Sequence, residues 1–140
     1  MAVGCFLDTN VFLYAISNSA GERQKRDRAR LLLQEDDWTV SVQVLQEFFV
    51  QATRPSRLEC LTSGEARQLI ESWHRFTVQA ITLEVMDLAL QFHERFSLSY
   101  WDAAILSAAQ MAGCNLLLSE DMADGMTYGS VQVRNPFAGL

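Results

Sequence analysis

The segment FLDTN, from Phe6 to Asn10, joins the end of a short apolar run to a carboxylate. The run VGCFL (Val3–Leu7) is short and apolar throughout, which predicts a buried strand. Asp8 therefore lies at the carboxyl end of the first predicted strand. Asp8 and the two residues after it are also types that cap helices, and a helix is predicted over residues 11–16. Position alone leaves Asp8 equally suited to capping and to catalysis.

The alternation of strand and helix continues along the chain. Short apolar runs predict strands over residues 38–42, 76–81, 115–119 and, at an edge of the sheet, 131–135. Helical periodicity and end signals predict helices over residues 22–34, 45–53, 63–73, 84–96 and 100–112. This order indicates an α/β fold with a mostly parallel sheet of four to five strands, covered on both faces. In such sheets ligands bind beyond the carboxyl ends of the strands.

Length and composition favour one globular domain over residues 1–140. Apolar residues make up 49% and charged residues 20% of the chain, as in folded proteins that bury a core. No apolar run approaches the roughly 20 residues that span a bilayer, and no basic leader precedes one. Three scattered cysteines form no disulfide framework or zinc pattern. We therefore expect a cytoplasmic protein that is not embedded in a membrane.

The charge is acidic overall but uneven. A net charge of −6, from 17 acids and 11 bases, argues against binding nucleic acid by bulk positive charge. Five bases nevertheless fall within one predicted helix: Arg23, Lys25, Arg26, Arg28 and Arg30. This basic stripe is compatible with contact to RNA phosphates or to an acidic partner, and equally with a solvated helix face.

Three further acids are predicted near the edge of the sheet where Asp8 lies. Glu47 lies on a helix, away from its apolar stripe, which by itself predicts a solvent-exposed side chain. Asp102 forms the spacing S-x-x-D with Ser99, which predicts a capping box. Asp121 follows the fourth predicted strand in a turn that also contains Glu120 and Asp124. Each has an ordinary structural explanation.

Taken together, these acids indicate a metal site. Carboxylates brought close together repel each other, and a divalent cation relieves that repulsion. Oxygen ligands without a histidine or cysteine cluster favour Mg²⁺ or Mn²⁺ over zinc. Such an ion binds phosphate oxygens and activates water, so an acidic pocket holding it suits phosphodiester hydrolysis.

Four segments also resemble a known family in order and spacing. They are FLDTNVFLYA (6–15), VLQEFF (44–49), SYWDAAI (99–105) and LLLSEDM (117–122). Together they resemble the PIN domain, and most closely the VapC-type ribonuclease toxins of bacterial toxin–antitoxin operons. The resemblance extends over nearly the whole chain.

The resemblance implies a three-layer α/β/α fold, a homodimer, cleavage of RNA with Mg²⁺ or Mn²⁺, and inhibition by a cognate antitoxin. The family's acidic quartet falls on Asp8, Glu47, Asp102 and Asp121, and its supporting polar residues fall on Thr9, Asn10 and Ser119. Asp8 and Asp102 would be the chief metal ligands, with Asp121 as the third and Glu47 binding directly or through water. Three acids compete at the last position; we expect Asp121 to be the ligand and Asp124 to be a possible helper.

Other functions fit the sequence less well. A phosphoaspartate enzyme of the haloacid dehalogenase type needs a second Asp where Asn10 stands. A response-regulator receiver needs a late lysine, whereas Lys25 is the only lysine of the chain. A catalytically silent interaction module remains the alternative from another class, although all four acids are intact. The three tryptophans, Trp38, Trp73 and Trp101, are predicted to be packing residues rather than base-stacking platforms.

Overall fold

The computed structural model describes residues 4–140, and its central sheet has six strands in the order β3-β2-β1-β4-β6-β5. The strands are β1 (Cys5–Leu7), β2 (Thr39–Ser41), β3 (Thr77–Gln79), β4 (Leu116–Leu118), β5 (Thr127–Tyr128) and β6 (Val131–Arg134). Every neighbouring pair is parallel except β5 and β6, which are antiparallel. The predicted α/β fold with a mostly parallel sheet is confirmed.

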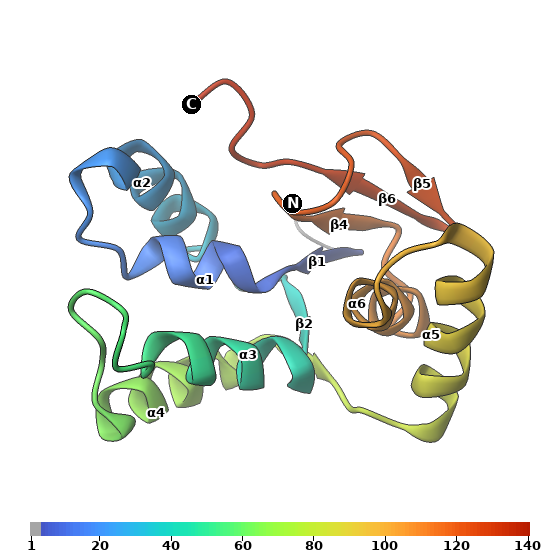
Figure 1. Cartoon of the computed structure of the whole chain (residues 1–140), viewed down its shortest axis with the longest axis horizontal. Coiled ribbons are helices and arrows are strands. Elements are labelled where there is room, and N and C mark those ends of the chain that lie inside the picture. Colours follow the sequence, from blue (N-terminus) through green and yellow to red (C-terminus); the bar gives the residue numbers. More distant parts are fainter. Residues whose placement is uncertain (1–3) are drawn as a thin grey trace.

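Helices cover the sheet on both sides. In Figure 1, α1 to α4 lie on one side of the strands, and α5 and α6 lie on the other. The helices are α1 (Thr9–Ala15), α2 (Arg23–Leu32), α3 (Val42–Ala52), α4 (Ser63–Ser72), α5 (Leu83–Phe96) and α6 (Tyr100–Met111), with 3₁₀ turns η1 (Ala20–Glu22) and η2 (Trp73–Arg75). Each predicted helix is present within a few residues of its expected ends. None of the helices in residues 4–140 is long and apolar enough to cross a membrane.

The far end of the sheet differs from the prediction. The strand predicted at an edge, β6, lies inside the sheet between β4 and β5. The edge is the two-residue strand β5, which turns back onto β6 through Gly129. The φ angle of Gly129 is +60°, and a Cβ atom there would lie 2.9 Å from Cζ of Phe92, so this turn needs glycine. At the other terminus, Val3 of the first predicted strand lies outside the described residues.

Strand order places a crevice beside β1. From β1 the chain crosses to β2 on one side, while β4 pairs with β1 on the other. Such a reversal leaves the carboxyl ends of the two central strands open between their connections. Phe6 pairs with Leu117 and Leu7 with Leu118, so the residues that follow these strands, Asp8 and Ser119, emerge side by side.

An aromatic cluster joins α1 and α3 to the 3₁₀ turn η2. The ring of Phe48, on α3, lies edge-on to Trp73 with centroids 4.8 Å apart and to Phe12 of α1 at 6.5 Å. Phe12 and Phe48 are fully buried. Buried aromatic rings of this kind are among the largest contributors to the stability of a core.

We expect the substitution Phe48→Ala to lower the free energy of unfolding by about 3–5 kcal/mol, because it removes a ring that no neighbour can replace. Val50→Ala on the same helix should cost about 0.5 kcal/mol, because Val50 is exposed. Urea denaturation of both variants measures the difference. Equal losses would show that α3 is not anchored through Phe48.

Candidate functional site

The four predicted acids line one pocket of about 460 Å³ at the carboxyl ends of β1 and β4. They come from four separate segments: the end of β1, the middle of α3, the first turn of α6 and the turn after β4. The pocket is lined by Asp8, Thr9, Asn10, Leu13, Gln43, Gln46, Glu47, Val50, Gln51, Trp101, Asp102, Ile105 and Asp121. Its lining contains four carboxylates and no basic side chain.

Asp8 is the buried acid of the pocket and is held by two hydrogen bonds. The Thr9 backbone N–H donates to its Oδ1 at 2.7 Å, and the Ser119 hydroxyl donates to its Oδ2 at 2.7 Å. The first bond makes Asp8 the N-cap of α1. The second joins β1 to β4 at the point where both strands end. Asp8 therefore caps a helix and faces the pocket at once, so the two interpretations left open by the sequence are compatible.

Burial raises the pKa of Asp8 from 3.8 to about 6, because a carboxylate is poorly solvated there. The hydrogen bonds from Ser119 and Thr9 act in the opposite direction, and the charges of Asp121 and Glu47 raise the pKa further. The two acids that act on Asp8 are thus close enough to repel it. Negative charge at the base of the pocket costs the folded state free energy.

Glu47 is half-buried and points to the start of α1. The Thr9 hydroxyl donates a hydrogen bond to Oε1 of Glu47 at 2.8 Å, which joins α1 to α3. The prediction of a solvent-exposed glutamate, made from the helical periodicity alone, is wrong because this contact draws the side chain into the pocket. The position that the family resemblance gave to Glu47 agrees with its place in the pocket lining.

Asp102 reaches the pocket from the first turn of α6. Its backbone N–H donates to the Ser99 hydroxyl at 3.2 Å, so Ser99 is the N-cap. The second bond of the predicted capping box is missing, and within residues 4–140 only Thr62 and Glu65 complete such a box. Burial raises the pKa of Asp102, the contact with Ser99 lowers it, and the charge of Asp121 raises it. Its carboxylate thus remains available to the pocket.

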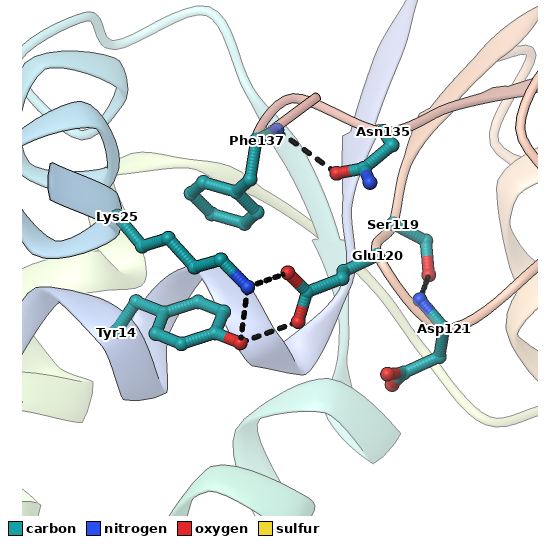
Figure 2. A network of polar contacts seen from close by, with 7 residues as sticks. All are labelled: Tyr14, Lys25, Ser119, Glu120, Asp121, Asn135 and Phe137. Carbon is teal, nitrogen blue, oxygen red and sulfur yellow. Dashed lines mark hydrogen bonds and ion pairs between the residues drawn. The ribbon is translucent and has the colours of Figure 1, made fainter. Parts of the chain in front are cut away.

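Two of the three acids after β4, Glu120 and Asp121, point in different directions (Figure 2). Glu120 accepts hydrogen bonds from Lys25 and from the Tyr14 hydroxyl. Burial acts to raise the pKa of Glu120, but these two donors outweigh it and leave the pKa below its usual value. Figure 2 shows the Asp121 carboxylate turned away from this network. The Asp121 backbone N–H donates a hydrogen bond to Ser119 Oγ at 3.1 Å.

Asp124 makes a structural contact elsewhere. Its Oδ1 accepts a hydrogen bond from the Asn135 backbone N–H at 2.8 Å, and it is not among the residues that line the pocket. Of the three acids of this turn, only Asp121 lines the pocket.

Asn10 stands in the pocket with an amide that has no partner. Its Oδ1 and Nδ2 are both buried and make no hydrogen bond with residues 4–140. A buried amide without partners costs the protein about 1–3 kcal/mol. The pocket thus holds a buried amide without a hydrogen-bond partner beside its four carboxylates.

The basic stripe on α2 is largely engaged within the chain. Four of its five bases contact other residues: Lys25 with Glu120, Arg26 with Asp27, Arg28 with the Pro136 carbonyl and Arg30 with the Ala15 carbonyl. Arg23 makes no hydrogen bond or ion pair to the part of the chain that the structure describes. Contact between the stripe and RNA or a partner remains a prediction.

Trp101 is a second residue of the pocket, after Glu47, whose exposure was predicted wrongly. Trp38 and Trp73 are 4% exposed and pack in the core as predicted, but Trp101 is 63% exposed. Its apolar character suggested burial, yet it lies on the open side of the first turn of α6. The sequence signal for a place near the site was its position directly before Asp102. Both residues lie in the first turn of α6, at the end of the helix that faces the pocket.

The sequence matches a known family model, and the fold is similar to those of solved structures. A family model described as the PIN domain matches residues 5–123. No curated protein matches the chain significantly. A toxin–antitoxin complex from Klebsiella pneumoniae has a chain that is 17% identical, with 95% of this chain and 98% of that chain covered and a TM-score of 0.70.

Two further solved structures are similar to the same extent. VapC20 of Mycobacterium tuberculosis, described as a sarcin–ricin loop cleaving toxin, is 18% identical, with 84% and 91% of the two chains covered and a TM-score of 0.66. FitAcB from Neisseria gonorrhoeae is 16% identical, with 96% and 99% covered and a TM-score of 0.67. At these identities the structures share the fold.

The raised pKa of Asp8 makes stability depend on pH. The protonated Asp8 carboxyl contributes fully to the free energy of unfolding below pH 3.8, and this contribution is lost as the pH rises through about 6. The loss amounts to roughly 3 kcal/mol. In EDTA, Asp8→Asn should therefore melt at a higher temperature than the parent at pH 7.5, and the gain should vanish toward pH 4. Thermal melts between these limits measure it. A variant less stable at every pH would show that the bonds to Thr9 and Ser119 outweigh the charge.

Proposed function

Because the chain belongs to the PIN domain family, whose model matches residues 5–123, we propose that it is an endoribonuclease that depends on Mg²⁺ or Mn²⁺ and acts as the toxin of a toxin–antitoxin pair. The observation that carries the proposal is the pocket in which Asp8, Glu47, Asp102 and Asp121 meet. A pocket with four carboxylates and no basic side chain repels a phosphate unless a bound cation offsets the negative charge of both.

The donor atoms fit a hard divalent cation. All the charged ligands are carboxylates, which Mg²⁺ and Mn²⁺ prefer. The raised pKa of Asp8 and the unpartnered amide of Asn10 are two features that a bound, hydrated ion would relieve. Within residues 4–140, however, no three acidic, histidine or cysteine side chains are placed close enough to hold an ion. Direct coordination of one ion by three carboxylates therefore requires at least one of them to move, whereas one or two carboxylates with water can hold Mg²⁺ as they stand.

Asp8, Asp102 and Asp121 would hold the ion, with Glu47 as a direct or water-mediated ligand. A divalent ion in such a site lowers the pKa of water and offsets negative charge that develops on the phosphate. Ser119 and the Thr9 backbone fix both oxygens of Asp8, and the Thr9 hydroxyl fixes Glu47. A water oxygen would attack the phosphorus in line and pass its proton to a carboxylate of the pocket. The bond to the departing sugar oxygen would break, and that oxygen would keep the electron pair and take a proton from solvent.

The proposed partners are an RNA substrate, a cognate antitoxin and a second copy of the chain. The toxin–antitoxin assemblies among the similar structures support an antitoxin partner. The similarity to VapC20, a toxin that cleaves the sarcin–ricin loop, supports RNA as the substrate class. The homodimer is supported by the family resemblance.

Asp121 and Asp124, which make no ion pair with residues 4–140, provide a matched test of the site. Asp8→Asn and Asp121→Asn should lower cleavage of single-stranded RNA in Mg²⁺ by about 100-fold or more, because each removes a ligand. Asp124→Asn should stay within about threefold of the parent, because its carboxylate contacts the Asn135 backbone instead. Gel assays with end-labelled RNA measure all three. Full activity of Asp8→Asn would reject the catalytic assignment, and an inactive parent would favour a silent interaction module.

Ion binding can also be measured without turnover. Mg²⁺ should raise the melting temperature of the parent protein, with a stabilisation of about 2.7 kcal/mol at a concentration 100 times the dissociation constant. The shift should disappear in Asp121→Asn and persist in Asp124→Asn. A sodium chloride series at equal ionic strength separates ion binding from screening. If all three proteins responded alike, the ion would not bind in the pocket.

A further inference from the structure

Trp101 presents a large aromatic surface to solvent at the rim of the acidic pocket. At 63% exposure it is far more accessible than Trp38 or Trp73, each 4% exposed. Leaving an indole in water forgoes a large hydrophobic gain. Packing against residues 4–140 leaves most of the Trp101 side chain exposed. The exposed indole is therefore a candidate surface for binding a ligand or another chain.

Trp101 makes one ring contact and one backbone hydrogen bond in its open surroundings. Tyr100 packs against it with ring centroids 5.1 Å apart and planes at 78°. The side-chain amide of Gln43, which is buried, donates to the Trp101 carbonyl at 3.3 Å. These two contacts fix the first turn of α6 around the indole. A rigid aromatic residue loses little entropy when a ligand stacks on it.

Trp101 also separates two hollows. It lines the acidic pocket and, together with Gln43 and Gln46, a second hollow of about 480 Å³ on the side of α5. The second hollow is lined mainly by apolar side chains, among them Ile81 and Met86. An RNA strand that places its phosphate among the carboxylates would thus meet an aromatic and apolar surface beside the acidic pocket.

We propose that Trp101 is a stacking platform for the nucleobase next to the scissile phosphate of single-stranded RNA, a role that rests on the proposed function. The pocket lining offers no basic side chain to bind phosphate, so contacts to the nucleobases would add to those that a bound ion makes to the phosphate. Stacking on an aromatic side chain is worth about 1–3 kcal/mol per base and tolerates every base. The amides of Gln43, Gln46 and Gln51 in the same lining can bond to base edges.

The alternative occupant is a second copy of the chain. Exposed Leu83 and Met86 lie in the lining of the second hollow beside Trp101, and an interface between copies would cover all three. Stacking and apolar packing have different chemical requirements. A base needs an aromatic ring, whereas an interface needs only an apolar side chain of similar size.

The test compares Trp101→Phe with Trp101→Leu, each combined with Asp8→Asn so that RNA is not cut. The probes are a ten-nucleotide oligoadenylate and an abasic ribose-phosphate chain of equal length. We expect oligoadenylate to quench the solvent-exposed tryptophan emission, which belongs to Trp101, and the abasic chain to leave it unchanged. Trp101→Leu should bind oligoadenylate about 5- to 150-fold more weakly, whereas Trp101→Phe should retain most of the affinity. Leu58→Ala is the control, since Leu58 is 84% exposed and lines neither hollow.

Three results would overturn the proposal: unchanged affinity in Trp101→Leu, equal quenching by the abasic chain, or a mass by light scattering that falls on both substitutions. The last would assign the indole to an interface between copies. RNA cleavage by the chain without substitutions, measured in parallel, distinguishes failure of the stacking platform from failure of the proposed function. If that chain cuts RNA while Trp101→Leu binds normally, only the platform is rejected. If it neither cuts nor binds RNA, both are rejected.

Discussion

The pairing of β1 with β4 is the constraint on which the site depends. Because Leu7 is paired with Leu118, the next residues of both strands, Asp8 and Ser119, must meet, and the Ser119 hydroxyl donates to Asp8. The same pairing buries the carboxylate and raises its pKa to about 6. The fold thus fixes an acid where ionisation is unfavourable, and packing elsewhere, as in the aromatic cluster around Phe48, has to offset that cost.

Local roles and site roles coincide in this protein. Asp8 caps α1 while facing the pocket, and the backbone of Asp102 bonds to Ser99 while its carboxylate stays available. The Thr9 backbone holds Asp8, and its hydroxyl holds Glu47. An ordinary structural explanation for an acid is therefore weak grounds for excluding it from a site, because the ends of parallel strands and the starts of helices occupy the same edge of the sheet.

Most of the fold could be predicted from the sequence because hydrophobic periodicity records which side of each helix is buried. The strand β5 could not, since Thr127 and Tyr128 have no pattern, and their pairing with β6 is set by the turn at Gly129. The motifs located the acids, but chain order could not separate Glu120 from Asp121. That distinction depends on Lys25, which draws Glu120 away from the pocket from 95 residues along the chain. Trp101 was predicted wrongly because hydrophobicity does not indicate which face of a first helical turn is covered.

The distribution of charge supports the proposal that the site binds a divalent ion instead of a fixed cation of the chain. No basic side chain lines the pocket, and two bases of α2 bond elsewhere, Lys25 to Glu120 and Arg30 to the Ala15 carbonyl. A lysine or arginine among the carboxylates would lower their pKa values permanently and occupy the space of the phosphate. A bound divalent ion would offset the negative charge of the carboxylates and leave coordination positions for water and for the substrate phosphate. The unbalanced acidity of the pocket is thus the property that couples its stability to its proposed chemistry.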